Sequence, residues 1–301
     1  MLCALSAQAQ TITESFGSGD NQFAIDFVQI GNPGNAADTT GIPNPVGQVN
    51  YVYNLGKYEI SRDQILKANE GGGLNINLWD MSSYGGNGAN RPATGITWLN
   101  AVQFVNYLNT SHGFSPAYKF SGGDFVLWDS SDLGYNSNNR FRNSLAKYFL
   151  PSRDEWYKAA YGSPSGSWYD FATGSNLAPV AVANGKNQDT AVYNGQGGPA
   201  DIDDAGGLSA WGTMAQGGNV WEWMESAFDG TNDTAGEYLE QRGGTWLDNY
   251  ISNSPELYMG VDPGYVDIHI GIRIASVPEP SALSLLAAGL GGLAVIRRRR
   301  S

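Results

Sequence analysis

The sequence predicts an α+β fold with short strands, few helices and much ordered loop. Glycine supplies 40 of the 301 residues and charged residues only 15% of them, a composition that disfavours long solvent-exposed helices. Hydrophobic residues make up 41% and aromatic residues 12%, which is ample for a sizeable core. Helical periodicity recurs in three segments, and the other apolar runs are short and strand-like. We therefore expect one loop-rich domain over residues 10–276, between two terminal segments.

Each predicted helix begins with a hydroxyl side chain in a capping position. The capping residues are Ser61, Thr97 and Ser152. The first helix should end at the glycines at 71–73 and the third at Gly162. Trp98 and Trp156 lie on the apolar faces of their helices. We expect both indoles to pack in the core rather than bind a ligand.

The predicted strands are short and separated by long loops. They cover residues 23–30, 49–60, 147–151, 242–246 and 268–275. Residues 163–210 are rich in Gly, Asn, Asp, Pro and Ser and form too long a segment for a plain connection. Asp201, Asp203 and Asp204 in this segment lack the distal glutamate of a calcium-binding loop. We interpret the segment as a turn-rich surface.

The charge balance excludes two classes of partner. Formal net charge is −12, and four of the 17 basic residues lie together at 297–300. Setting those four aside leaves 13 basic against 29 acidic side chains, a net charge of −16. Such a body repels nucleic-acid phosphates and anionic lipid, so we expect no nucleic-acid binding. Divalent cations would be tolerated.

Sulfur and imidazole ligands are scarce in this chain. Its one cysteine, Cys3, lies in a segment that we expect to be removed. The body therefore has no disulfide, thiolate metal site or cysteine nucleophile. The only histidines are His112 and His269, so a site with three imidazoles is excluded. An iron site with two histidines and one carboxylate would need both of them to converge.

Residues 1–9 have features of a targeting segment. They form a short apolar run that ends in Ala7-Gln8-Ala9, the form of a signal-peptidase site, without a basic start. We interpret them as the remnant of a truncated signal peptide. An ordinary N-terminal strand is the alternative.

Residues 277–301 combine three features in a fixed order. Pro278, Glu279 and Pro280 precede an apolar run over 282–296, which is followed by Arg297, Arg298, Arg299 and Arg300. As a helix this run would span roughly 23 Å, short against a hydrocarbon core of about 30 Å. The arginines should stay on the cytoplasmic side.

This combination resembles the bacterial PEP-CTERM sorting signal, and a plain C-terminal membrane anchor is the alternative. The resemblance implies a precursor that is transiently anchored in the inner membrane by a short transmembrane helix. An exosortase would process it and deliver the protein to the cell surface or to the exopolysaccharide matrix.

Four motif pieces follow each other along the body. They are GKYEIS at 56–61, FLPSRDEWYKAAYG at 149–162, GGNVWEW at 217–223, and RGGTW at 242–246 followed by GIRIAS at 271–276. Together they resemble the formylglycine-generating enzyme, or sulfatase-modifying factor, family over residues 23–276. The resemblance implies a C-type lectin-like fold. For Arg242 and Arg273, which belong to these pieces, we expect guanidinium contacts with loop carbonyls rather than with substrate.

The resemblance also implies an oxidase with a copper-binding cysteine pair, which this sequence lacks. The two cysteine positions follow the RGG-S/T-aromatic stretch and fall here near Asp248 and Asn253. A carboxylate and an amide do not replace the sulfur ligands that copper(I) prefers. We therefore expect no copper and no formylglycine-generating activity. Asp248, Asn249, Tyr250 and Asn253 become candidate ligand-binding residues, and no catalytic residue is predicted.

Glu222, in the stretch GGNVWEW, is the candidate metal ligand. In the resembling enzymes this glutamate binds calcium with backbone carbonyls and an Asn or Asp side chain, whose position falls here at Ala215. With the backbone of Gly218 and Val220, Glu222 could form only a weakened calcium site. The alternative, which we favour, is a structural carboxylate that accepts hydrogen bonds, because an unpaired buried carboxylate is strongly unfavourable.

Three functional hypotheses follow from these observations. The first is an exported, non-catalytic binding or matrix protein, because aromatic and amide side chains suit flat polar ligands such as saccharides. Export toward exopolysaccharide would supply a partner of that kind. The second is an enzyme of the same family with altered, thiol-independent chemistry. The third is a purely structural surface protein.

Overall fold

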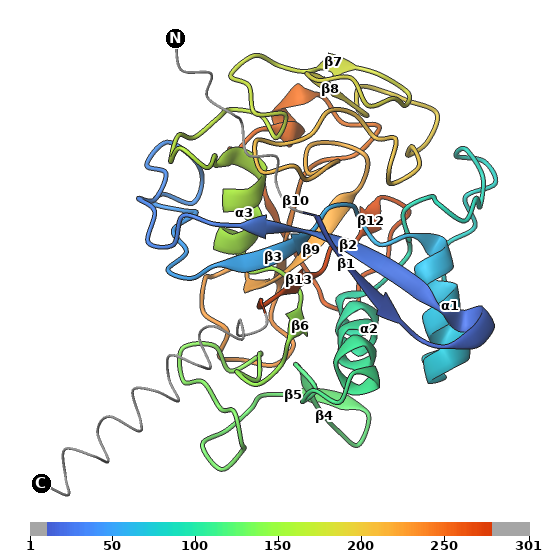
Figure 1. The fold of residues 1–301 in the computed structure, drawn as a ribbon, viewed down its shortest axis with the longest axis vertical. Helices are drawn as coiled ribbons and strands as arrows, with labels where there is room; N and C mark the ends of the chain where they lie inside the picture. The colour runs from blue at the N-terminus through green and yellow to red at the C-terminus, as the bar shows by residue number, and fades with distance from the viewer. Residues whose placement is uncertain (1–10, 279–301) are drawn as a thin grey trace, which may run out of the picture.

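Two small β-sheets form the centre of the computed structural model, which describes residues 11–278 (Figure 1). The predicted signal-peptide remnant lies outside the described residues. So do Glu279, Pro280, the apolar run at 282–296 and the four arginines of the sorting signal. Within residues 11–278, no helix has the length and hydrophobicity needed to cross a bilayer.

The first sheet has the strand order β1-β2-β3-β13-β6, with neighbouring strands antiparallel. Its strands are β1 (Thr11–Phe16), β2 (Phe23–Ile30), β3 (Tyr53–Gly56), β6 (Tyr148–Phe149) and β13 (Ala275–Ser276). In β2 the alternating residues Phe23, Ile25 and Phe27 are buried, as expected for a strand with one face on the core. The late strand β13 lies between the early strand β3 and β6, so distant parts of the chain meet here.

The second sheet has the strand order β11-β10-β9-β12. Its strands are β9 (Trp221–Ala227), β10 (Leu239–Arg242), β11 (Met259–Val261) and β12 (Ile270–Gly271). Strand β12 runs parallel to β9, whereas the other pairs are antiparallel. The pairing of β9 with β10 contains an irregularity between Leu239 and Gln241. This sheet carries the WEW and QR stretches, which makes it the scaffold of the site described below.

The predicted helices and their caps are confirmed. Helix α1 is Arg62–Gly72, α2 is Trp98–Ser111 and α3 is Arg153–Tyr161, each preceded by a complete capping box. Gly73 ends α1 with a left-handed φ of 65°, a conformation that glycine adopts without strain. Trp98 and Trp156 are at most 1% exposed, so their predicted core packing is also confirmed. Short 3-10 helices occur at Gly19–Asn21 (η1) and Tyr250–Asn253 (η2).

Of the five strand predictions, only that at 23–30 was right in extent, and the prediction at 147–151 contributes only the two residues of β6. Of residues 242–246 only Arg242 belongs to a strand, because Gly243 and Gly244 have φ values of 108° and 76° and turn the chain away. Residues 268–275 do not form one strand, since β12 and β13 belong to different sheets. The segment at 49–60 contributes only the four residues of β3.

The segment 163–210 carries little regular structure. It contains β7 (Val180–Ala181) paired with β8 (Thr190–Ala191), whereas β4 (Lys119–Ser121) and β5 (Asp124–Val126) form a separate hairpin at the opposite end of the molecule (Figure 1). Asp201 pairs with Arg91 and Asp203 with Lys186 at the surface. Within residues 11–278, no group of three or more His, Cys, Asp or Glu side chains is arranged to hold a metal ion.

Candidate functional site

Glu222 lies in a fully buried ion pair. Its Oε1 accepts a hydrogen bond from Arg273 Nη2 at 2.7 Å, and its Oε2 accepts one from Arg273 Nε at 3.0 Å. Trp156 Nε1 donates to Oε2 at 2.6 Å. Neither Glu222 nor Arg273 has any exposed side-chain surface. The carboxylate therefore ties β9 to helix α3 and to the segment between β12 and β13.

Arg273 and Arg242 both bridge loop carbonyls, as predicted. Arg273 donates to the carbonyl oxygens of Gly56 and Met214 at 2.9 and 2.7 Å. Arg242 donates to that of Ile42 at 2.6 Å. Since Arg273 and Trp156 already engage both oxygens of Glu222, its contacts favour the structural alternative. Calcium binding with the backbone of Gly218 and Val220 stays a prediction.

A second buried carboxylate, Glu59 of the GKYEIS piece, was not singled out in the sequence. Glu59 is 1% exposed and accepts hydrogen bonds from Asn219 Nδ2 at 2.6 Å and from the Val220 amide at 3.3 Å. Burial, and then the charge of Glu222, raise the pKa of Glu59 well above its usual range, although Arg273 opposes this. Glu59 thus holds the turn that precedes β9.

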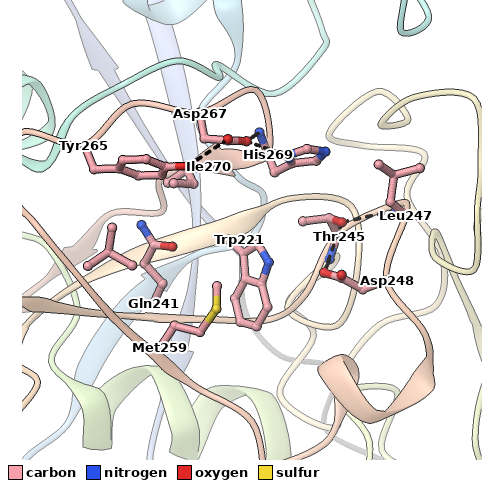
Figure 2. Close-up of a pocket in the computed structure, with 11 residues that line it drawn as sticks. Trp221, Gln241, Thr245, Leu247, Asp248, Met259, Tyr265, Asp267, His269 and Ile270 are labelled. Carbon is pink, nitrogen blue, oxygen red and sulfur yellow. Dashed lines mark hydrogen bonds and ion pairs between the residues drawn. The ribbon is translucent and has the colours of Figure 1, made fainter.

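A cavity of about 400 Å³ opens beside β9, β10 and β11 (Figure 2). Its apolar lining comes from Trp221, Leu247, Met259, Val261 and Ile270, and its polar lining from Gln241, Thr245, Asp248, Tyr265, Asp267 and His269. This volume lies in the range of small-molecule sites, which combine an apolar wall with a few polar groups. The cavity is therefore our candidate functional site.

Gln241 contributes an unsatisfied amide to the cavity wall. Its side chain is fully buried, and neither Nε2 nor Oε1 has a hydrogen-bond partner among the described residues. Figure 2 shows the amide between the side chains of Tyr265 and Trp221. A buried polar group without a partner destabilises a protein by about 1–3 kcal/mol and is uncommon in native structures. A ligand with hydroxyl or amide groups would supply the missing partners.

Asp267 holds His269 in a defined orientation at the same cavity (Figure 2). Asp267 Oδ1 contacts His269 Nδ1 and accepts from the backbone amide of His269 at 2.9 Å, and Oδ2 accepts from the Tyr265 hydroxyl at 3.1 Å. The imidazole packs on Trp246 with ring centres 4.7 Å apart. Its Nε2 is buried and has no partner among the described residues. The other histidine, His112, does not line the cavity and stacks on the ring of Phe16.

Of the candidate ligand-binding residues, Asp248 lines the cavity. Its Oδ2 accepts from the Thr245 amide at 3.0 Å and from the Thr245 hydroxyl at 3.1 Å. No described residue donates a hydrogen bond to its Oδ1. Asp248 is half-buried, so its carboxylate has one oxygen committed to the protein and one available to a ligand.

The other three candidates, Asn249, Tyr250 and Asn253, are not part of this lining. Tyr250 and Asn253 belong to the 3-10 helix η2, and the side chain of Asn249 caps that helix by accepting from the backbone amide of Ile251. Tyr250 is 51% exposed. Asn253 is 1% exposed and borders a separate cavity of about 10 Å³. Sequence position alone therefore grouped four residues that the fold places in different surroundings.

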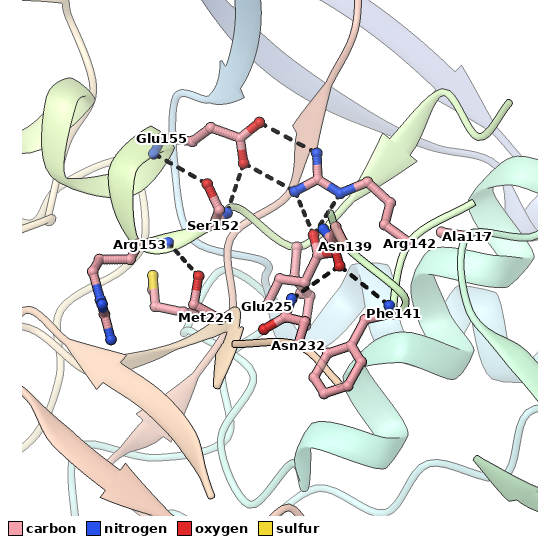
Figure 3. Close-up of polar contacts among 12 residues, drawn as sticks. Ala117, Asn139, Phe141, Arg142, Ser152, Arg153, Glu155, Met224, Glu225 and Asn232 are labelled. Carbon is pink, nitrogen blue, oxygen red and sulfur yellow. Dashed lines mark hydrogen bonds and ion pairs between the residues drawn. The ribbon is translucent and has the colours of Figure 1, made fainter. Parts of the chain in front are cut away.

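Arg142 joins two buried carboxylates away from the cavity (Figure 3). It donates to Glu225 Oε2 at 2.5 Å and to Glu155 Oε2 at 3.0 Å, and Tyr51 donates to Glu155 Oε1 at 2.6 Å. Burial raises the pKa of Glu155, but the charge of Arg142 together with the hydrogen bonds to the carboxylate outweighs this effect, so the pKa of that carboxyl is lowered. For Glu225, burial outweighs the same guanidinium and raises the pKa. The cluster connects the start of α3 with β9.

Comparison with known proteins assigns the body to a family. The sulfatase-modifying factor enzyme 1-like domain matches residues 27–277. The chain belongs to this family. Residues 276–300 match the PEP-CTERM protein-sorting motif. The protein therefore carries a sulfatase-modifying factor domain together with a signal for exosortase processing and for export toward the cell surface.

Solved structures with similar folds align with this chain over nearly their whole length. CarF matches with a TM-score of 0.61 and 18% identity, over 85% of this chain and 99% of CarF. Treponema denticola variable protein 1 matches with a TM-score of 0.59, 17% identity and coverages of 89% and 99%. PvdO from Pseudomonas aeruginosa matches with a TM-score of 0.57, 14% identity and coverages of 88% and 98%. These matches confirm the C-type lectin-like, α+β fold.

A curated relative of this sulfatase-modifying factor domain is the chaperone protein LppX of Paenibacillus barcinonensis. It is 23% identical over 217 residues, which cover 64% of this chain and 69% of LppX.

Motif pieces of the sulfatase-modifying factor family converge on the cavity in this chain. The NVWEW piece supplies Trp221, the RGGTW piece supplies Thr245, and the residues before GIRIAS supply Asp267 and His269. Asp248, near one of the positions where the resemblance places a cysteine, lies in the same lining. The expectations of no copper and of no formylglycine-generating activity stay predictions.

Proposed function

We propose that this exported sulfatase-modifying factor domain is a non-catalytic binding module whose cavity takes up a sugar residue of an exopolysaccharide. The observation that carries the proposal is the amide of Gln241, which is buried at the cavity wall with both of its polar atoms unpaired. A sugar presents hydroxyl groups that donate and accept, so one ring could pair with both atoms.

The neighbouring groups support a sugar more than a wholly apolar ligand. Trp221 gives the cavity an aromatic surface beside Gln241, on which the apolar face of a sugar ring could pack. Asp248 Oδ1 and His269 Nε2 provide further hydrogen-bonding atoms around the same space. The sorting signal directs the protein toward the cell surface, where extracellular polysaccharide is a plausible partner.

Replacing Gln241 by methionine is expected to weaken saccharide binding about tenfold or more, while leaving the fold intact or more stable. The variant removes the hydrogen bonds to the sugar and also removes an unsatisfied buried amide, whose penalty is about 1–3 kcal/mol. Calorimetric titration of the full chain with saccharides from a glycan-array screen, together with thermal melts, measures both effects.

The matched control is Gln29→Met, at an exposed position on β2, which should change neither quantity. Binding that survives Gln241→Met unchanged would contradict the assignment of the cavity as the sugar site.

The second hypothesis, an enzyme with thiol-independent chemistry, is favoured by one observation. Asp267 holds His269 with a ring nitrogen unpaired at the cavity, an arrangement that resembles a general base and its orienting carboxylate. The two hypotheses differ in what happens to the bound saccharide. A binding module releases the saccharide with its mass unchanged. An enzyme of the second kind would convert it during incubation to a product of different mass.

Replacing Pro278, Glu279 and Pro280 by alanine is expected to abolish processing by exosortase. The precursor should then keep its full mass and stay with the inner membrane, because the apolar run and the arginines are unaltered. Mass spectrometry and fractionation of cells measure this. A variant that reaches the surface with the same mass as the parent would show that these residues are not the processing signal.

A further inference from the structure

The charged groups of the cavity are unevenly distributed. Asp248 and Asp267 line it, and no Lys or Arg of the described residues does. The carboxylate of Asp267 is committed, since one oxygen contacts His269 and the other accepts from Tyr265. Asp248 has one oxygen bonded to Thr245 and one without a donor among the described residues. Among the carboxylate oxygens of the cavity, Asp248 Oδ1 is therefore the one that no described residue engages.

This oxygen lies in surroundings that favour a cation. Trp221 and Tyr265 place aromatic rings in the same lining, and aromatic faces attract ammonium groups. Because Asp248 is half-buried, solvent screens its charge only in part, which strengthens its attraction for a positive group and its repulsion of a negative one. The body has a net charge of −16 when the four terminal arginines are set aside. This charge adds to the attraction of cations and to the repulsion of anions.

We propose that the sugar bound by this cavity is an amino sugar with a free, protonated amine, and this rests on the proposed function. The ammonium group would donate to Asp248 Oδ1, because a charge-assisted hydrogen bond is stronger than a neutral one. Ring hydroxyls would pair with the amide of Gln241. Uronic acids and sulfated sugars are excluded by the same charge. The cavity thus distinguishes sugars by charge as well as by shape.

The test compares three probes of equal length on the full chain: glucosamine oligomers, N-acetylglucosamine oligomers and galacturonic acid oligomers. We expect the glucosamine oligomer to bind about tenfold or more tightly than the acetylated one, and the uronic acid oligomer not to bind. Asp248→Asn should lower the affinity for the glucosamine oligomer to that for the acetylated oligomer and so remove this preference. The preference should also decrease with added salt.

The matched control is Asp229→Asn, which makes the same charge change in an exposed turn where the carboxylate accepts a backbone amide. It should leave the preference intact. Equal binding of the free and acetylated oligomers by the parent would overturn the amine proposal and leave the proposed function standing. If no saccharide binds at all, the proposed function fails as well. Loss of binding of every probe in Asp248→Asn, with an unchanged melt, would also overturn selection by charge.

Discussion

Replacing Glu222 by alanine is expected to lower the free energy of unfolding by about 3–5 kcal/mol, the usual effect of breaking a buried ion pair by removing one partner. The change leaves the guanidinium of Arg273 without its ion-pair partner in a site with no solvent exposure. It also removes the acceptor of the Trp156 indole N–H. Urea denaturation of the parent and the variant measures the difference.

The double variant Glu222→Met with Arg273→Met provides the comparison. Because it removes both charges, its free energy of unfolding should fall by less than that of Glu222→Ala. Glu256→Ala, at an exposed position, should have little effect. A loss below about 1 kcal/mol for Glu222→Ala would contradict the structural role. Thermal melts of the parent and of Glu222→Ala with calcium test the calcium hypothesis. An ion bound at Glu222 would raise the melting temperature of the parent alone.

Replacing Arg142 by methionine is expected to lower the free energy of unfolding by about 3–5 kcal/mol at neutral pH. The variant leaves Glu155 and Glu225 buried without their shared cation. In the parent, Arg142 lowers the pKa of Glu155, so this carboxyl stabilises the fold above its unfolded pKa and loses that contribution on acidification.

Without Arg142, burial should raise the pKa of both carboxyls above their unfolded value. Folding then takes up protons, and stability falls as the pH rises above about 4.5. The difference between parent and variant should therefore grow from pH 5 to pH 7, by up to about 1.4 kcal/mol per pH unit for Glu155 and by less for Glu225, whose pKa is already raised in the parent. Arg140→Met is the matched control, because Arg140 has no carboxylate partner among the described residues. A difference that does not vary with pH would contradict this account.

The sequence predicted the helices well because their signals are local. Ser61, Thr97 and Ser152 each cap a helix through a residue three positions later, within one turn. The strands were predicted less well, since β6, β12 and β13 have two residues each and are defined by distant partners. No window of sequence around Ala275 shows that it pairs with both Leu55 and Phe149.

The site was predictable only in part, for the same reason. The need for a partner at Glu222 followed from the cost of burying a carboxylate, but Arg273 lies 51 positions away. Asp248 was found by its place in a motif. Gln241 was not, because its distinguishing property is the absence of contacts in the folded state. Asn253 was grouped with Asp248 by motif position, whereas the fold places it at the end of η2 beside a separate cavity.

The position of β13 between β3 and β6 determines when the first sheet can be completed during synthesis. Strand β3 ends at Gly56 and pairs with β2 on one side, but its neighbour on the other side, β13, is synthesised more than two hundred residues later. Contacts between such distant segments slow folding, since a long loop must close before the pairing gains stability. The native first sheet therefore cannot be completed until residue 276 has been synthesised. Strand β13 is followed after one residue by the sorting motif, so the last strand of the body and the processing signal are synthesised together.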